Sequence, residues 1–183
     1  MKIGIISLGC AKNLVDSEVM LGTLRKEGIE LTAKPNEADA VIVNTCSFID
    51  ASKQESINTI LEANARRETN PSQALIVTGC LSQSYPEQLK KDMPERDAFV
   101  GLDQITQITG IVRSAIEARR SNRQSAIGNR QLFVTPKPTF VPDYATPRYR
   151  LTPAHFAYVK IAEGCNHPCS FCIIPQIRGK HRS

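Results

Sequence analysis

Residues 41–46 read Val41-Ile42-Val43-Asn44-Thr45-Cys46, a short run of β-branched apolar residues that ends on a polar pair and a cysteine. A run of this kind, too short for a helix, predicts a β-strand that is buried on both faces of a sheet. Similar phrases end on Cys10 and on Cys80, so the three cysteines follow one another at intervals of 36 and 34 residues. Such an interval is the length of one strand-plus-helix unit, and it predicts repeated units of a parallel sheet.

Apolar residues at helical spacing fill the gaps between the apolar runs. We expect four strands, at residues 2–8, 40–45, 74–78 and 98–101, each followed by a helix. The side chains expected to open these helices as caps or capping boxes are Asn13, Ser47 or Ser52, Ser84 and Asp103. The alternation of strand and helix predicts an α/β fold, in which an open parallel sheet carries helices on both faces.

The chain divides into three parts. Residues 1–121 carry the alternating pattern, whereas residues 122–152 lose it and contain four prolines, which indicates a linker. Residues 153–183 begin a further domain, in which residues 155–162 alternate like a strand that leads to Cys165.

Composition narrows the class of protein. Of the 183 residues 41% are hydrophobic, so the chain can bury a core and is not wholly disordered. No apolar run approaches the ~18 residues that a membrane helix needs, and the N-terminus reads as a first strand rather than a signal peptide. We therefore expect a cytoplasmic protein without a membrane partner. In that compartment its six cysteines are expected to bind metal rather than to form disulfides.

Charge is distributed unevenly along the chain. Residues 1–110 hold 11 Lys and Arg against 15 Asp and Glu, whereas residues 111–183 hold 12 against 3. A basic second half suggests a polyanionic partner such as RNA or a ribonucleoprotein. An ordinary solvated surface explains the same counts equally well.

The densest chemical signal is Cys165-Asn166-His167-Pro168-Cys169-Ser170-Phe171-Cys172, a C-x₃-C-x₂-C motif. Thiolates at this spacing can reach one metal centre, and soft sulfur ligands suit iron–sulfur clusters, zinc or Cu(I). A structural zinc site would need a fourth ligand, for which His167 and His181 are candidates. A four-iron cluster held by three cysteines keeps one iron open, and this arrangement favours a catalytic site.

The cysteines that follow the predicted strands form a second candidate site. The carboxyl ends of parallel strands lie at one edge of a sheet, where ligands bind, so Cys10, Cys46 and Cys80 should meet there. Three thiolates at one edge can hold a second cluster. The alternative is that they are small buried cysteines that pack like other apolar residues.

These motifs resemble the methylthiotransferase family of radical S-adenosylmethionine enzymes. The C-x₃-C-x₂-C spacing with Phe171 before the last cysteine is similar to the radical S-adenosylmethionine signature. The stretches that resemble the family's N-terminal domain and radical site are residues 7–18, 44–50, 77–81 and 163–179. The phrase from Ala11 to Glu18 is most similar to the branch that modifies a ribosomal protein.

The resemblance implies two [4Fe-4S] clusters and S-adenosyl-L-methionine as cofactors. Cys165, Cys169 and Cys172 would hold the radical cluster, whose open iron binds S-adenosylmethionine, and Phe171 would lie near the adenine. Cys10, Cys46 and Cys80 would hold an auxiliary cluster that delivers the methylthio group.

The resemblance also implies a substrate and partners. The implied reaction inserts a methylthio group at an unactivated C–H bond of an aspartate in a small-subunit ribosomal protein, either free or in the assembled ribosome. The alternatives are a tRNA adenosine methylthiotransferase and a non-catalytic zinc or iron–sulfur module. A flavodoxin or ferredoxin would donate electrons. The resemblance implies that residues 153–183 begin a radical S-adenosylmethionine α/β half-barrel. Because the family continues into that domain beyond the motif, we expect this chain to be an N-terminal portion that is inactive alone.

Overall fold

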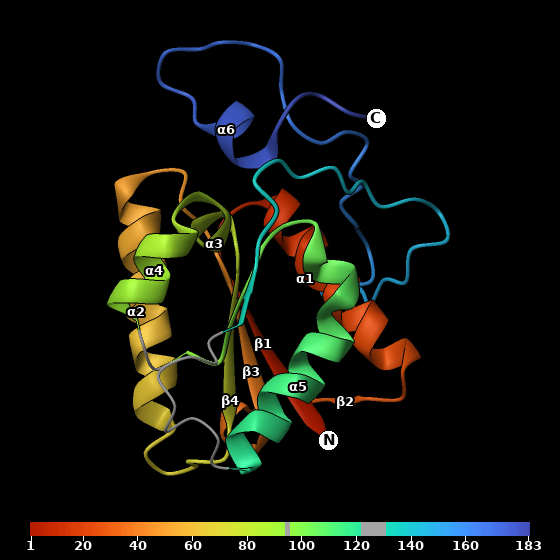
Figure 1. The fold of residues 1–183 in the computed structure, drawn as a ribbon. Helices are drawn as coiled ribbons and strands as arrows, with labels where there is room; N and C mark the ends of the chain where they lie inside the picture. Colours follow the sequence, from red (N-terminus) through yellow and green to blue (C-terminus); the bar gives the residue numbers. More distant parts are fainter. Residues whose placement is uncertain (94–95, 122–130) are drawn as a thin grey trace.

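The computed structural model describes residues 1–93, 96–121 and 131–183. Its strands form one sheet (Figure 1), and they are β1 (Lys2–Ser7), β2 (Glu30–Leu31), β3 (Ala40–Thr45), β4 (Ala74–Gly79), β5 (Ala98–Val100) and β6 (Gln131–Phe133). The helices are α1 (Ala11–Lys26), α2 (Asp50–Arg66), α3 (Cys80–Ser84), α4 (Pro86–Asp92), α5 (Ile108–Arg120) and α6 (Ile174–Arg178), with 3₁₀ turns η1 (Pro35–Glu37) and η2 (Gln104–Gln107). No helix within these described ranges is long and apolar enough to cross a membrane.

The order of the strands indicates where a ligand can bind. The sheet order is β2-β1-β3-β4-β5-β6, and every neighbouring pair is parallel, which confirms the expected open parallel sheet. In this flavodoxin-like order the chain moves from β1 toward one edge of the sheet and continues from β3 toward the other. Ligands of open α/β sheets bind in the crevice at such a switch point, outside the carboxyl ends of the strands. The relevant strand ends are those of β1 and β3.

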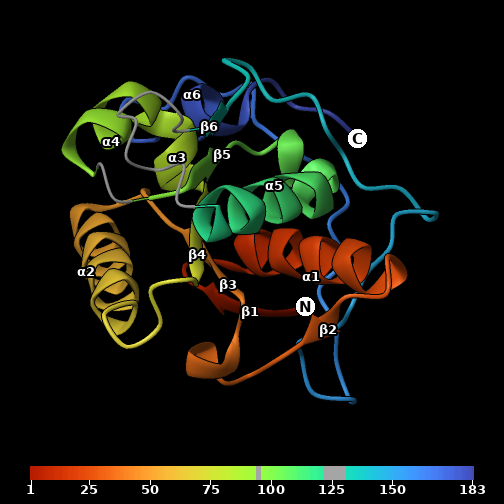
Figure 2. The ribbon, with the colours of Figure 1, turned by 60° about the horizontal axis from the view of Figure 1, so that its bottom comes forward.

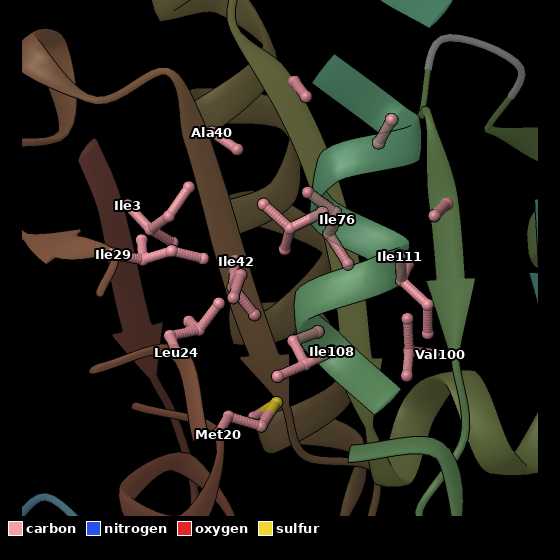
Figure 3. Packing of buried hydrophobic residues seen from close by; sticks show 14 of the residues in the cluster. Ile3, Met20, Leu24, Ile29, Ala40, Ile42, Ile76, Val100, Ile108 and Ile111 are labelled. Carbon is pink, nitrogen blue, oxygen red and sulfur yellow. The ribbon is translucent and has the colours of Figure 1, made fainter. Parts of the chain in front are cut away.

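Helices cover both faces of the sheet. One face carries α1 and α5 side by side, and the other carries α2 and α4 (Figure 1, Figure 2). Consecutive strand residues point to opposite faces, so Ile42 and Ile76 pack with residues of α1 and α5 (Figure 3), whereas Val43 and Val77 pack with residues of α2 and α4. All four side chains are fully buried, which explains why these strands read as continuous apolar runs.

The four expected strands are formed, but a fifth is not. Residues 155–162 have no regular secondary structure, and Val159 and Ile161 are 77% and 82% exposed. The prediction of a strand here was wrong because a strand needs a hydrogen-bonded neighbour, and no described strand lies beside this stretch. Conversely, β2 and β6 were not predicted because two or three residues carry no readable alternation.

The predicted linker contributes to the sheet. Its residues 122–130 lie outside the described part of the chain, and Gln131–Phe133 pairs with β5 as strand β6. The chain then runs along α1 and returns over the carboxyl ends of the strands, where α6 lies (Figure 1). Glu18 anchors this path, because its carboxylate accepts hydrogen bonds from Arg148 Nε at 2.6 Å and from the Leu151 N–H at 2.7 Å.

Helix starts were predicted less well than strands. Helix α2 begins at Asp50 without a side-chain cap, and the hydroxyl of Ser47 lies 3.2 Å from that of Ser84 instead. Asp103 accepts a hydrogen bond from the backbone N–H of Thr139 rather than capping the next helix. Both side chains interact with distant parts of the chain, and local patterns do not reveal such partners.

Replacing Gly79 by alanine should destabilise the protein more than replacing Gly28. Both glycines have a positive φ, of +95° and +74°, and a non-glycine residue in such a region costs roughly 1–3 kcal/mol. At Gly79 the new Cβ would also collide with the backbone of Thr45, whereas nothing lies within 4 Å at Gly28. Urea unfolding of the two variants measures the difference, and equal losses of stability would contradict this account.

Candidate metal centre

The cysteines Cys10, Cys46 and Cys80, here called the edge triad, lie at the ends of neighbouring strands. They follow β1, β3 and β4, which are adjacent in the sheet. Thr45 of β3 pairs with Gly79 of β4, and Cys46 and Cys80 are the next residues after the two strands. All three are free thiols. The parallel sheet therefore places all three after the carboxyl ends of adjacent strands, and their binding of a metal group stays a prediction.

Two glycines bring the backbone close to these thiols. Gly9 and Gly79 have φ of +86° and +95°, a region that favours glycine. A Cβ built on Gly9 would lie only 3.0 Å from Cys46 Sγ, so the backbone next to Cys10 lies directly against Cys46. A side chain at Gly9 would collide with the side chain of Cys46.

Asn13 joins the strand ends to Cys80. It lies inside α1 rather than at its start, and it is fully buried. Its Nδ2 donates to the carbonyl oxygens of Leu8 at 2.9 Å and Thr45 at 2.8 Å, while its Oδ1 lies 3.7 Å from Cys80 Sγ. The prediction of a cap was wrong because the carbonyls of Leu8, just after β1, and of Thr45, the last residue of β3, need donors, and Asn13 provides them.

Burial differs among the three thiols. Cys10 is exposed, whereas Cys46 and Cys80 are each 6% exposed. Burial raises the pKa of Cys80 to about 11, although the positive charge of Arg178 acts in the opposite direction. Without metal Cys80 is therefore a neutral thiol at pH 7, and binding of a metal there would release its proton.

Arg178 is the cation beside Cys80. It is the last residue of α6 and is 1% exposed. Its Nη2 donates to Cys80 Sγ at 3.5 Å and to Asp16 Oδ2 at 3.0 Å. Its Nη1 donates to both carboxylate oxygens of Glu163, each at 3.1 Å. Hydrogen bonds between a guanidinium and carboxylates are among the stronger ones in proteins.

Lys160 completes a buried ionic network with Asp16, Glu163 and Arg178. Its ammonium lies 2.6 Å from Glu163 Oε2 and also bonds to Asp16, and no side chain of the four is more than 4% exposed. Burial alone would raise the pKa of Glu163, but the charges of Arg178 and Lys160 outweigh it and lower that pKa to about 2. The ionised network attaches residues 160–178 to α1.

The cysteines Cys165, Cys169 and Cys172, here called the loop triad, lie on a loop that is closed at its base. Glu163 and Arg182 form an antiparallel bridge, and the Cys165 N–H donates to the Gly179 carbonyl at 3.1 Å. The backbone on either side of the motif is therefore held together.

The tip of this loop is open to solvent. Cys169 is exposed, and Cys165 and Cys172 are partly exposed. The Cys172 N–H donates to the Cys169 carbonyl at 3.1 Å, which forms a turn between them. Phe171 is 87% exposed, and its place beside an adenine stays a prediction.

The chemistry of the donor set, three thiols, is of the kind that iron–sulfur clusters take. Among the residues that the structure describes, no group of three or more His, Cys, Asp or Glu side chains could hold one metal ion. An iron–sulfur cluster does not need its thiolates to meet at one ion, because each iron takes its own thiolate. At the edge triad, three free thiols lie near glycine backbone, and a buried cation can balance thiolate charge.

The sequence did not reveal the ionic network. In the sequence, Asp16 lies near the start of an expected helix and Arg178 follows the C-x₃-C-x₂-C motif, and neither position indicates a buried partner. One signal was available, since Lys160 stands between Val159 and Ile161 in an otherwise apolar stretch. A charge at such a position often has a buried partner, but the sequence alone does not name it.

Comparison with known proteins defines the class of the chain. Residues 2–101 match a family described as Uncharacterized protein family UPF0004, which covers more than half of the 183 residues. The chain belongs to this family.

The most similar curated relatives include three bacterial proteins, each named Ribosomal protein uS12 methylthiotransferase RimO. The chain is 54% identical to the protein of Opitutus terrae, 50% to that of Akkermansia muciniphila and 46% to that of Pelotomaculum thermopropionicum, in each case over its whole length. These alignments cover 39% of each relative, so the chain spans about two fifths of their length. The resemblance to the N-terminal portion of methylthiotransferases is thereby confirmed.

Replacing Glu163 by glutamine should release residues 160–182 from α1. The substitution leaves Lys160 and Arg178 buried with Asp16 as their remaining carboxylate, and removing one partner of a buried pair typically costs about 3–5 kcal/mol. Hydrogen exchange of this segment and urea unfolding measure the effect. Glu37→Gln is the control, because the Lys34–Glu37 pair is exposed and its loss should not be measurable. Equal behaviour of the two variants would contradict the importance of the network.

Proposed function

We propose that this chain forms part of a radical S-adenosylmethionine methylthiotransferase that modifies an aspartate of ribosomal protein uS12. The names of the relatives support the substrate. The observation that carries the proposal is the edge triad, whose free thiols follow three adjacent strands while Arg178 joins them to the segment of the loop triad. Two separate thiol triads match an enzyme with two clusters, whereas a one-cluster enzyme needs a single triad.

The two triads have different roles in this proposal. The loop triad would hold the cluster that binds S-adenosylmethionine, with Phe171 at the adenine, and the edge triad would hold the second cluster. When bound, these groups supply the radical that removes a hydrogen atom and the sulfur and methyl group that replace it.

The chain's own residues hold these groups and limit the access of water. The buried thiols of Cys46 and Cys80 close the inner side of the edge triad, while exposed Cys10 leaves its outer side open to a substrate. The exposed loop triad is accessible to an electron donor such as flavodoxin or ferredoxin. The substrate protein would be met either free or in the assembled ribosome.

Iron analysis of the full-length enzyme tests the two-cluster assignment. After anaerobic reconstitution it should bind about eight irons, and alanine at Cys165, Cys169 and Cys172 should leave about half and abolish cleavage of S-adenosylmethionine. Alanine at the edge triad should preserve cleavage, measured as 5′-deoxyadenosine, and abolish methylthio transfer, measured by mass spectrometry. Bound zinc without iron would favour a non-catalytic module. Normal methylthio transfer without the edge triad would refute its role.

An assay with two substrates distinguishes the branches of the family. The full-length enzyme should methylthiolate uS12 and leave tRNA unmodified, and modification of a tRNA adenosine alone would favour the alternative. Residues 1–183 alone serve as a control and should be inactive, because their loop triad is open to water and a radical site needs to be closed. Mass spectrometry of the protein and of digested tRNA measures all three results.

A further inference from the structure

We propose that Arg178 is a positioning residue that couples the two triads and raises the reduction potential of the cluster bound by the edge triad. This inference rests on the proposed function, because it assumes that the edge triad holds a redox-active group. It is based on one contact: a guanidinium from the segment of the loop triad donates to a sulfur of the edge triad.

Arg178 links the two ends of the segment that carries the loop triad. It follows Cys172 by six residues, and its partner Glu163 precedes Cys165 by two. Both oxygens of Glu163 accept from Nη1 at 3.1 Å, while Nη2 lies 3.5 Å from Cys80 Sγ. A guanidinium is planar and rigid, so a displacement of the loop-triad segment would also displace the donor at Cys80.

The carboxylates do not use all of the donors of Arg178. Lys160 also contacts both Asp16 and Glu163, and Nη2 of Arg178 donates to Cys80 Sγ at 3.5 Å besides its bond to Asp16. A thiolate at Cys80 would therefore meet a charged donor that is already in place.

A buried donor at a ligand sulfur affects the two redox states differently. Reduction adds negative charge to a cluster, and a nearby positive N–H group stabilises that charge. The contact is shielded from solvent, so salt screens it weakly. Loss of the guanidinium should therefore lower the reduction potential of the edge-triad cluster.

The test uses the full-length enzyme with Cys165, Cys169 and Cys172 replaced by alanine, so that only the edge-triad cluster is observed. Arg178→Gln removes the charge, and Arg178→Lys keeps the charge but not the planar group. Arg178→Gln combined with Asp16→Asn removes one charge of each sign, which preserves the charge balance if the single variant does not fold.

Arg148→Gln is the matched control. It removes another long-range arginine–carboxylate contact on α1, that with Glu18. The structure records no contact between Arg148 and an edge-triad sulfur among the described residues. If the Arg178 variants acted only by loosening the chain that packs on α1, this control would shift the potential as well.

Three measurements decide the outcome: iron and sulfide content, midpoint potential from a titration followed by electron paramagnetic resonance, and Fe–S stretching frequencies from resonance Raman spectra. We expect a lower potential and shifted Fe–S frequencies in both variants that carry Arg178→Gln, a smaller change in Arg178→Lys and none in Arg148→Gln. Unchanged potential in the Arg178 variants, or an equal shift in Arg148→Gln, would overturn the inference. If the parent, which carries only the three loop-triad replacements, binds no iron, the proposed function is refuted and the inference falls with it. The iron content therefore distinguishes failure of the proposed function from failure of the inference.

Discussion

The buried contacts of Arg178 with Asp16 and Glu163 determine how the two cysteine triads are related. Burying charged groups is costly unless each has a partner, and here every member of the network is almost fully excluded from water. The carboxylates come from α1 and from the segment before the loop triad, and the cations come from both sides of that triad, Lys160 before it and Arg178 after it. The segment is therefore stabilised mainly when it docks as a unit, which brings the loop triad to the edge where the strands end.

Helix α1 packs against the sheet and also binds the chain that returns from β6. Its apolar residues Val19, Met20 and Leu24 pack against the sheet. Several polar side chains of its first two turns are buried, among them Asn13, which binds the strand ends, and Glu18, which binds the returning chain. The residues from Ala11 to Glu18 are also those by which the sequence resembles the ribosomal-protein branch. The structure shows what the polar side chains of residues 11–18 do: they connect α1 to the segment that carries the loop triad.

Sequence patterns predicted the parallel sheet and the common edge of Cys10, Cys46 and Cys80, because both follow from local periodicity and from the geometry of parallel strands. They failed where a side chain has a distant partner. Asn13 was expected to cap a helix but bonds to a carbonyl 32 residues away, and Arg178 meets Asp16 across 162 residues. The strand expected at residues 155–162 failed for a related reason, since pairing depends on a neighbour that the stretch itself cannot specify.

The ionic network also offers another explanation for the excess of basic residues in the second half of the chain. The excess of basic residues after position 110 could indicate a polyanionic partner, but several of them pair within the chain. Arg120 contacts Asp39 at 2.8 Å, and Arg148, Lys160 and Arg178 contact acidic residues of α1. Opposite charges in the two halves thus promote docking of one half on the other. Charge complementarity of this kind is satisfied within the molecule, so the imbalance is not by itself evidence for binding to RNA.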